Sequence, residues 1–212
     1  MKEFPQYKTI YTGNPCSEDA IKKSAIEKSK FGLSENKKLV LIVMGSLGSS
    51  KINDFFKDSI ALFNNKDYEV LYVTGKESYE SFRNLKVPKN VKIVPYIDNM
   101  TRIMKKTDIM VSRAGASTLS EITALNIPSI LIPSPYVPDN HQFKNAMDLV
   151  KNDSAIMLEE SLLKGDILVR TIDLLIKDEK KMKQMRSNLK KMSVSNSATL
   201  IYNSIRKLID GK

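Results

Sequence analysis

The sequence predicts an α/β protein with a Rossmann-like, doubly wound parallel sheet. Residues 39–44 are apolar at every position, which is typical of a strand covered on both faces of a parallel sheet. Further short apolar runs alternate with longer segments whose apolar residues recur at helical spacing. Strands separated by helices indicate right-handed β-α-β crossovers, and 212 residues suffice for one large domain of this kind.

The elements are expected in a simple order along the chain. An extended lead-in covers 1–15, with a short strand at 7–11, and a helix capped by Ser17 follows over 17–31. Strands are expected at 39–44, 68–74, 91–94, 109–112, 129–132 and 155–158, and the other helices after Ser49, at 77–84, at 100–106, around Glu121, and at 140–151, 166–177, 178–192 and 196–209.

Composition narrows the class of protein. The formal net charge is +10, and a single cysteine, Cys16, excludes an internal disulfide; with only one histidine, a Cys/His metal site is excluded too. No run is long enough for a bilayer span and no signal-peptide pattern is present, so a soluble cytoplasmic protein is expected. The lysines are scattered without interleaved aromatic residues, which argues against nucleic acid but leaves anionic lipid or a diphosphate open as partners.

Ligands of open α/β sheets bind beyond the carboxyl ends of the strands, where three loops carry candidate residues. The first, GSLGSS, follows the strand at 39–44. Gly45 and Gly48 let backbone N–H groups approach a phosphate closely, and the next helix adds the free donors of its N-terminus. The loop has neither the dinucleotide fingerprint nor a P-loop ending, so a plain strand-to-helix turn is an equal alternative.

The second loop, SRAGASTLSE, ends at Glu121. Gly115 frees the turn, and the following N–H groups and hydroxyls could hold a diphosphate whose charge Arg113 neutralises. A carboxylate such as Glu121 can accept from both hydroxyls of a ribose. The structural alternative is a capping box, because Thr118 and Glu121 have the required spacing.

The third loop contains His141 and Gln142 after the strand at 129–132. A lone histidine is usually structural or solvated, but the neighbouring amides and the position after a strand favour recognition of sugar hydroxyls. The chain contains no Asp-x-Asp triplet, the carboxylate pair that commonly holds a divalent metal in nucleotide-sugar enzymes, and no G-x-S-x-G elbow.

Six motifs follow one another along the chain: TGNP, GSLGS, YIDNM, SRAGASTLSEI, PSILIP and NHQFKNA. Together they resemble the donor-binding half of the MurG family of bacterial glycosyltransferases, a family similar to glycosyltransferase family 28. The resemblance covers nearly the whole chain. It implies one half of a GT-B fold in an inverting, metal-independent enzyme that transfers GlcNAc from UDP-GlcNAc to lipid I, forming lipid II in peptidoglycan synthesis.

The resemblance also implies a donor site without a catalytic residue, metal or cofactor. The backbone of Ile97 should read the uracil edge, Glu121 the ribose, and His141 with Gln142 the GlcNAc hydroxyls. The residues expected around UDP-GlcNAc are Gly45, Ser46, Gly48, Ile97, Arg113, Gly115, Ala116, Ser117, Thr118, Leu119, Ser120, Glu121, His141, Gln142 and Asn145.

The chain departs from the family pattern in sequence and in length. Met44 stands where a glycine is usual before the first loop, and Ser17 where an arginine is usual. An N-terminal acceptor domain is expected in the complete enzyme. The resemblance therefore divides the chain into a linker with a lead-in helix (1–33), a donor-binding domain (34–195) and a C-terminal helix (196–212) that crosses back to the acceptor domain.

On this interpretation the chain binds donor without turnover, while the intact enzyme uses lipid I at the cytoplasmic face of the cell membrane and binds no nucleic acid. Two alternatives stay open: the half-sized catalytic subunit of a two-chain dolichol-linked GlcNAc transferase, and a non-catalytic basic module that binds anions.

Overall fold

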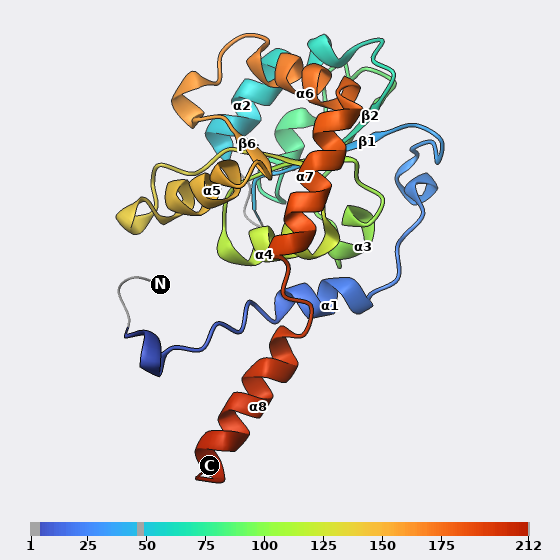
Figure 1. Cartoon of the computed structure of the whole chain (residues 1–212). Helices are drawn as coiled ribbons and strands as arrows, with labels where there is room; N and C mark the ends of the chain where they lie inside the picture. The colour runs from blue at the N-terminus through green and yellow to red at the C-terminus, as the bar shows by residue number, and fades with distance from the viewer. Residues whose placement is uncertain (1–4, 46–48, 212) are drawn as a thin grey trace.

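The computed structural model describes residues 5–45 and 49–211, and these contain a six-stranded parallel sheet in the order β3-β2-β1-β4-β5-β6 (Figure 1). The strands are β1 (Leu39–Val43), β2 (Glu69–Val73), β3 (Val91–Val94), β4 (Ile109–Ser112), β5 (Ser129–Leu131) and β6 (Ala155–Met157). From the centre of the sheet, β1, β2 and β3 follow one another toward one edge, and β4, β5 and β6 follow one another toward the other edge. This arrangement confirms the predicted Rossmann-like fold.

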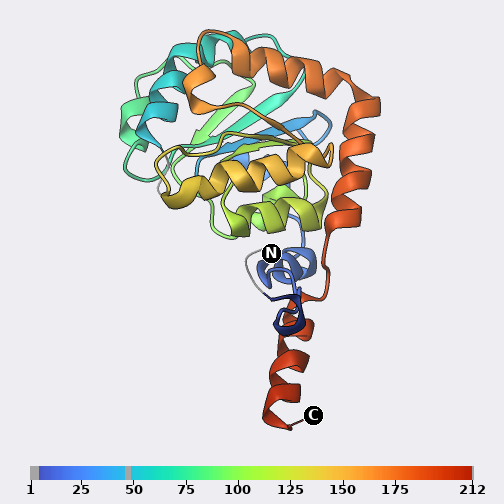
Figure 2. The same cartoon turned by 60° about the vertical axis from the view of Figure 1, so that its left-hand side comes forward.

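Helices cover both faces of the sheet (Figure 2). They are α1 (Cys16–Lys22), α2 (Ser50–Ser59), α3 (Thr101–Met104), α4 (Ala116–Leu125), α5 (His141–Lys151), α6 (Ile167–Lys177), α7 (Glu179–Met192) and α8 (Ser197–Ile209). Short 3₁₀ turns lie between them: η1 (Gln6–Lys8), η2 (Lys28–Phe31), η3 (Ile60–Phe63), η4 (Tyr79–Phe82), η5 (Pro138–Asn140) and η6 (Glu160–Leu162). Helices α2 and α6 form one layer, α4 and α5 the other, and α7 runs past the sheet between them.

Two apolar clusters hold these layers together. Alternate residues of β1 face opposite sides, so Val40 and Ile42 pack toward α2 and α6 while Leu39 and Leu41 pack toward the α3–α5 side. All five residues of β1 are buried, as its unbroken apolar run predicts. The strand is therefore fixed at the centre of the sheet, and the loop that follows it opens at the carboxyl edge.

Helix α1 is shorter than the sequence predicts. Helix α1 ends at Lys22, and Lys23 is extended (φ −66°, ψ 141°), although the sequence pattern predicts a helix to residue 31. Two contacts with α3 take the place of helical hydrogen bonds: the N–H of Ile26 donates to the carbonyl of Arg102 (3.2 Å), and Lys105 Nζ donates to that of Ile21 (2.6 Å). Tertiary contacts thus override local helix preference here.

Other local predictions were wrong in detail. Residues 6–8 form a 3₁₀ turn instead of a strand, and the helix predicted at 77–84 is only the turn η4. Helix α1 begins at Cys16, before Ser17, and its first turn is capped from outside by Asn14 Oδ1, which accepts from the Cys16 N–H (3.0 Å). The hydroxyl of Ser17 instead donates to the backbone carbonyl of Asn14.

Helix α8 extends away from the sheet (Figures 1 and 2). Apolar side chains along it are open to solvent: Tyr202, Ile205, Leu208 and Ile209 are 51% to 84% exposed. The expected crossing of this helix to another domain stays a prediction.

Candidate donor-binding site

The reversal of strand order between β1 and β4 gives the fold its natural ligand site. Ligands of open α/β sheets lie in the crevice where the strands on either side connect in opposite directions. Here that crevice lies beyond Val43 and Ser112, which pair in the parallel register of β1 and β4. The loops that leave these two strands are two of the three that the sequence singles out.

The turn between β4 and α4 leaves the start of α4 without a side-chain cap. Gly115 is the N-cap residue in an extended conformation (φ −71°, ψ 143°), so Ala116 is the first helical residue. The capping box that the spacing of Thr118 and Glu121 allows is therefore absent, because Thr118 lies inside the first turn instead of preceding it. The free N–H groups of a ten-residue helix face the crevice end, where they can meet an anion.

Arg113 makes three contacts within the protein, and its expected contact with a diphosphate stays a prediction. Its Nη2 lies 2.6 Å from Glu160 Oε2 and donates to Ser49 Oγ (3.0 Å), and its Nη1 donates to the carbonyl oxygen of Ile132 (3.1 Å). The carboxylate of Glu160 is almost fully buried, and Lys51 Nζ approaches its other oxygen at 3.3 Å. Sequence reasoning missed Glu160, since no motif connects it to a residue 47 positions earlier.

Lys51 connects this ion pair to the third loop. Its ammonium group lies 3.3 Å from the hydroxyl of Tyr136 and 5.9 Å from the centre of that ring. The contact with Tyr136, followed by that with Glu160, raises the pKa of Lys51, so it carries its charge throughout the neutral range.

The loop between β5 and α5 is held by two of the predicted sugar-side residues. Gln142 Oε1 accepts from the backbone N–H of Ser134 (2.9 Å), and Asn145 Nδ2 donates to the carbonyl oxygen of Ala114 (3.1 Å). His141 is the first residue of α5, and its imidazole is exposed. The second hydrogen bond brings α5 and the turn before α4 together, as the sequence predicts.

Glu121 lies in the second turn of α4, on the side that packs against α1. Its side chain is half-buried, and burial raises the pKa of its carboxyl group; Lys23 opposes this shift and Asp19 adds to it. The charges that act on this carboxyl group are those of Asp19 in α1 and of Lys23, which directly follows this helix. Its expected contact with a ribose stays a prediction.

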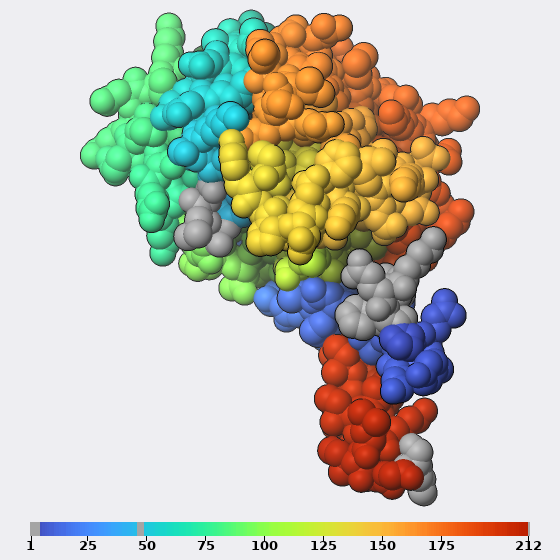
Figure 3. Space-filling view, turned by 90° about the vertical axis from the view of Figure 1, so that its left-hand side faces the viewer, coloured from blue at the N-terminus to red at the C-terminus, as the bar shows by residue number. Residues whose placement is uncertain are grey.

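A hollow of about 760 Å³ opens between α4, α5 and the lead-in. Four of the predicted site residues line it, namely Ala116, Leu119, Ser120 and Asn145, together with Gly13 and Asn14 of the lead-in. Figure 3 shows this face, where α5 and its preceding loop (yellow) lie between α2 (cyan) and the lead-in (blue). The lead-in thus forms one wall of the hollow.

Other predicted residues lie elsewhere or outside the description. Gly45 is exposed with φ +90°, a conformation that favours glycine, and no atom of the described residues lies within 4 Å of the position that a Cβ would take there. Ser46 and Gly48 lie outside the described residues. The side chain of Ile97 is buried in the core on the α3–α5 side, which leaves only its backbone for the uracil contact expected of it.

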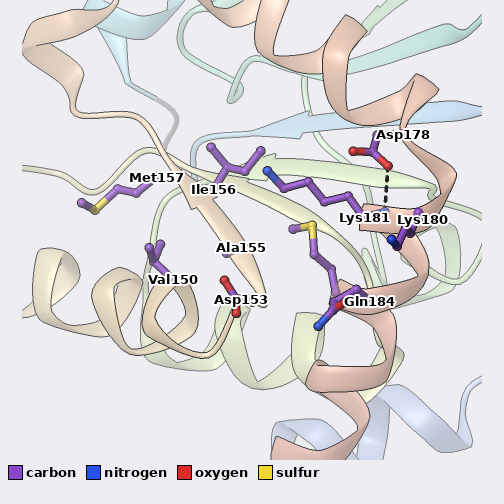
Figure 4. A pocket seen from close by; sticks show the side chains of 10 residues that line it. Val150, Asp153, Ala155, Ile156, Met157, Asp178, Lys180, Lys181 and Gln184 are labelled. Carbon is purple, nitrogen blue, oxygen red and sulfur yellow. Dashed lines mark hydrogen bonds between the residues drawn. The ribbon is translucent and has the colours of Figure 1, made fainter.

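A second hollow, of about 710 Å³, lies beside the edge strand β6 (Figure 4). Ile156 and Met157 of β6 and Met185 of α7 give it an apolar wall, while Lys181 reaches across from α7. Among the residues that the structure describes, no predicted donor-site residue lines this hollow.

Within residues 5–45 and 49–211, no three His, Cys, Asp or Glu side chains are grouped as a metal site would require. Over the same residues, no helix is both long enough and apolar enough to span a bilayer.

The sheet order and the linked loops at its crevice define a Rossmann-like domain of the GT-B glycosyltransferase type. The chain belongs to glycosyltransferase family 28, since residues 39–201 match the model described as the glycosyltransferase family 28 C-terminal domain.

Two curated relatives are N-acetylglucosamine transferases of Bacillus species. The chain is 42% identical over 214 residues to the UDP-N-acetylglucosamine--N-acetylmuramyl-(pentapeptide) pyrophosphoryl-undecaprenol N-acetylglucosamine transferase 1 of Bacillus cereus, covering 99% of this chain and 59% of the relative. It is 40% identical over 210 residues to the corresponding transferase of Bacillus subtilis, covering 97% and 58%. The chain thus spans less than two thirds of the length of these relatives.

Solved structures support the fold. MurG of Acinetobacter baumannii matches with a TM-score of 0.77 and 21% identity, over 96% of this chain and 57% of that one. MnaA of S. aureus in a co-structure with UDP matches with a TM-score of 0.71 and 14% identity, over 97% and 56%. At these identities the likeness concerns the fold alone.

Proposed function

We propose that this chain binds UDP-GlcNAc as the donor half of an inverting N-acetylglucosaminyltransferase that converts lipid I to lipid II in peptidoglycan synthesis. The observation that carries the proposal is the linkage of the loops after β1, β4 and β5 at the reversal of strand order. Arg113 joins the first two through Ser49, and Asn145 joins the last two through Ala114. The names of the curated relatives supply the choice of donor and acceptor.

Each part of the donor would meet a suitable group. The uncapped start of α4 offers N–H donors and a partial positive charge to the diphosphate. Glu121 is the candidate for the ribose hydroxyls, and the exposed His141 for the sugar. Gln142 and Asn145 would contribute by holding the loops in place through their hydrogen bonds. A direct contact of either residue with the sugar would come in addition to these bonds.

The proposal includes binding without a divalent metal. The leaving diphosphate would be stabilised by the helix terminus and by the net positive charge around Lys51 and Arg113. Calorimetry with UDP-GlcNAc in excess EDTA, and again with millimolar Mg²⁺, should give the same affinity. A requirement for Mg²⁺ would overturn this part of the proposal.

Acceptor binding is assigned to the additional length of the relatives, so the 212-residue chain should bind donor without transferring sugar. Calorimetry with UDP, UDP-GlcNAc and UDP-glucose tests donor binding, and UDP-GlcNAc should bind more tightly than UDP-glucose. Absence of heat for all three at millimolar ligand would overturn the proposed function.

We place the intact enzyme at the cytoplasmic face of the cell membrane, because its proposed acceptor is lipid-linked. The net charge of +10 would favour attraction to anionic headgroups. Co-flotation of the chain with phosphatidylglycerol vesicles but not with phosphatidylcholine vesicles is the expected result. Equal flotation with both would remove charge as the basis of membrane contact.

A further inference from the structure

We infer that Glu160 is a positioning residue for donor binding, which acts through Arg113 without touching the donor. The inference rests on the proposed function and concerns the same site. It assigns to a residue outside every recognised motif the task of holding the loops of that site in one geometry.

Glu160 is placed where a charge is unusual. It begins the turn η6, directly after β6 and at the same carboxyl edge as the candidate site, and it is only 5% exposed. A buried carboxylate needs compensation, and two cations supply it: Arg113 Nη2 at 2.6 Å and Lys51 Nζ at 3.3 Å. Among residues 5–45 and 49–211 neither oxygen has a partner of ordinary hydrogen-bond geometry, so the compensation is one of charge.

The ion pair joins four loops. Glu160 comes from the loop after β6, Arg113 from the loop after β4, and Lys51 from the first turn of α2 after β1. The remaining donor contacts of Arg113 reach Ser49 in the loop after β1 and the carbonyl oxygen of Ile132 at the end of β5. One buried carboxylate therefore fixes a guanidinium that contacts three neighbouring loops.

The geometry of this contact explains why a small change should matter. A guanidinium presents its N–H groups in a rigid planar fork, so the charge of Glu160 beside Nη2 holds the whole group in the position from which it reaches Ser49 and Ile132. Gly115 and Ala116 follow Arg113 by two and three residues, so the same contact sets the start of α4. A binding site built on pre-positioned loops loses affinity when the loops must be ordered by the ligand.

The side chain of Glu160 is only 2% exposed. It does not line the hollow that Ala116, Ser120 and Asn145 share, and its side chain is buried under both cations. Its effect on binding must therefore pass through the groups it holds.

The test measures UDP-GlcNAc affinity and thermal unfolding of the 212-residue chain in four variants. Glu160→Gln keeps the shape and removes the charge, Arg113→Lys keeps the charge and removes the fork, and the third variant combines both. Glu159→Gln is the matched control, because this neighbouring carboxylate is exposed. Both single variants should weaken donor binding about tenfold, and the double variant no more than the weaker-binding single variant.

The outcomes separate the inference from the proposed function. Wild-type protein that binds neither UDP nor UDP-GlcNAc overturns the proposed function and the inference with it. Wild-type binding together with unchanged or tighter binding by Glu160→Gln overturns the inference alone, as does a multiplicative loss in the double variant. If Glu160→Gln does not fold, the folded Arg113→Lys variant decides, and wild-type affinity in it refutes the inference.

Discussion

The side-chain amide of Asn145 donates to the carbonyl oxygen of Ala114 over 3.1 Å, which ties α5 to the turn that precedes α4. Both residues come from motifs that the sequence marks as ligand-binding. Asn145, one of the predicted binding residues, therefore also holds the candidate site together. Its contact links α5, which carries His141, to α4, which begins two residues after Ala114.

Replacing Asn145 with alanine should lower both stability and donor affinity. Loss of a half-buried hydrogen bond costs about 1 kcal/mol of unfolding free energy, and freeing the turn should weaken UDP binding severalfold. Urea unfolding and calorimetry measure the two effects, with the exposed Asn203→Ala as control. Full stability in Asn145→Ala would show that the contact does not bind α5 to the turn.

Glu121→Gln should make the chain more stable and a poorer binder at neutral pH. Burial raises the pKa of this carboxyl group above its ordinary value of 4.5, so the folded state holds its proton more strongly than the unfolded state. Stability from this group is therefore complete below pH 4.5 and is lost as pH rises through the folded-state pKa. The variant avoids that loss.

Thermal unfolding at pH 4 and pH 7.5 checks the stability effect. The melting temperature of Glu121→Gln should exceed that of wild type at pH 7.5 and equal it near pH 4. If Glu121 holds the ribose, UDP affinity at pH 7.5 should fall about tenfold or more. Wild-type affinity for UDP would remove Glu121 from the site, and the exposed Glu77→Gln controls for a general charge effect.

Comparing His141→Ala with Gln142→Ala should separate sugar recognition from loop support. Gln142 Oε1 holds the Ser134 N–H, so its loss should weaken UDP and UDP-GlcNAc alike, with any sugar contact adding a further loss for UDP-GlcNAc. His141 is exposed at the start of α5, and its loss should affect only UDP-GlcNAc. Equal loss of both ligands in His141→Ala would contradict a role at the sugar.

Gly13→Ala should detach the lead-in from the domain. Gly13 has φ +70°, and a Cβ there would lie 2.6 Å from Ser197 Oγ and 2.8 Å from Val194 Cβ. Gly165→Ala is a matched control, because Gly165 also has a positive φ (+55°) but no atom of residues 5–45 and 49–211 within 4 Å of the position of an added Cβ. Limited proteolysis should cleave the lead-in of Gly13→Ala faster than that of Gly165→Ala, since only the first adds a steric clash. Equal cleavage would mean that the close approach is unimportant.

The sequence alone determined the architecture of this protein and predicted that three of its loops share one edge of the sheet. Apolar runs such as β1 are hydrophobic at every position because both faces of the strand are covered, and this pattern is local enough to read from the chain. The same holds for the helices α6, α7 and α8, whose predicted bounds agree with the structure within one residue. The loops after β1, β4 and β5 were predicted as one site because the carboxyl ends of parallel strands share an edge.

Only the tertiary structure decided how that site is held together. The end of α1 depends on Lys105 and Arg102 of a distant segment, and the wall formed by Gly13 depends on packing against Val194. The expected contact of Arg113 with a diphosphate stays a prediction, whereas the structure pairs this residue with Glu160, a partner that no periodicity or motif in the sequence indicates. A buried charge needs an opposite charge close by, and the tertiary fold determines which residue supplies it.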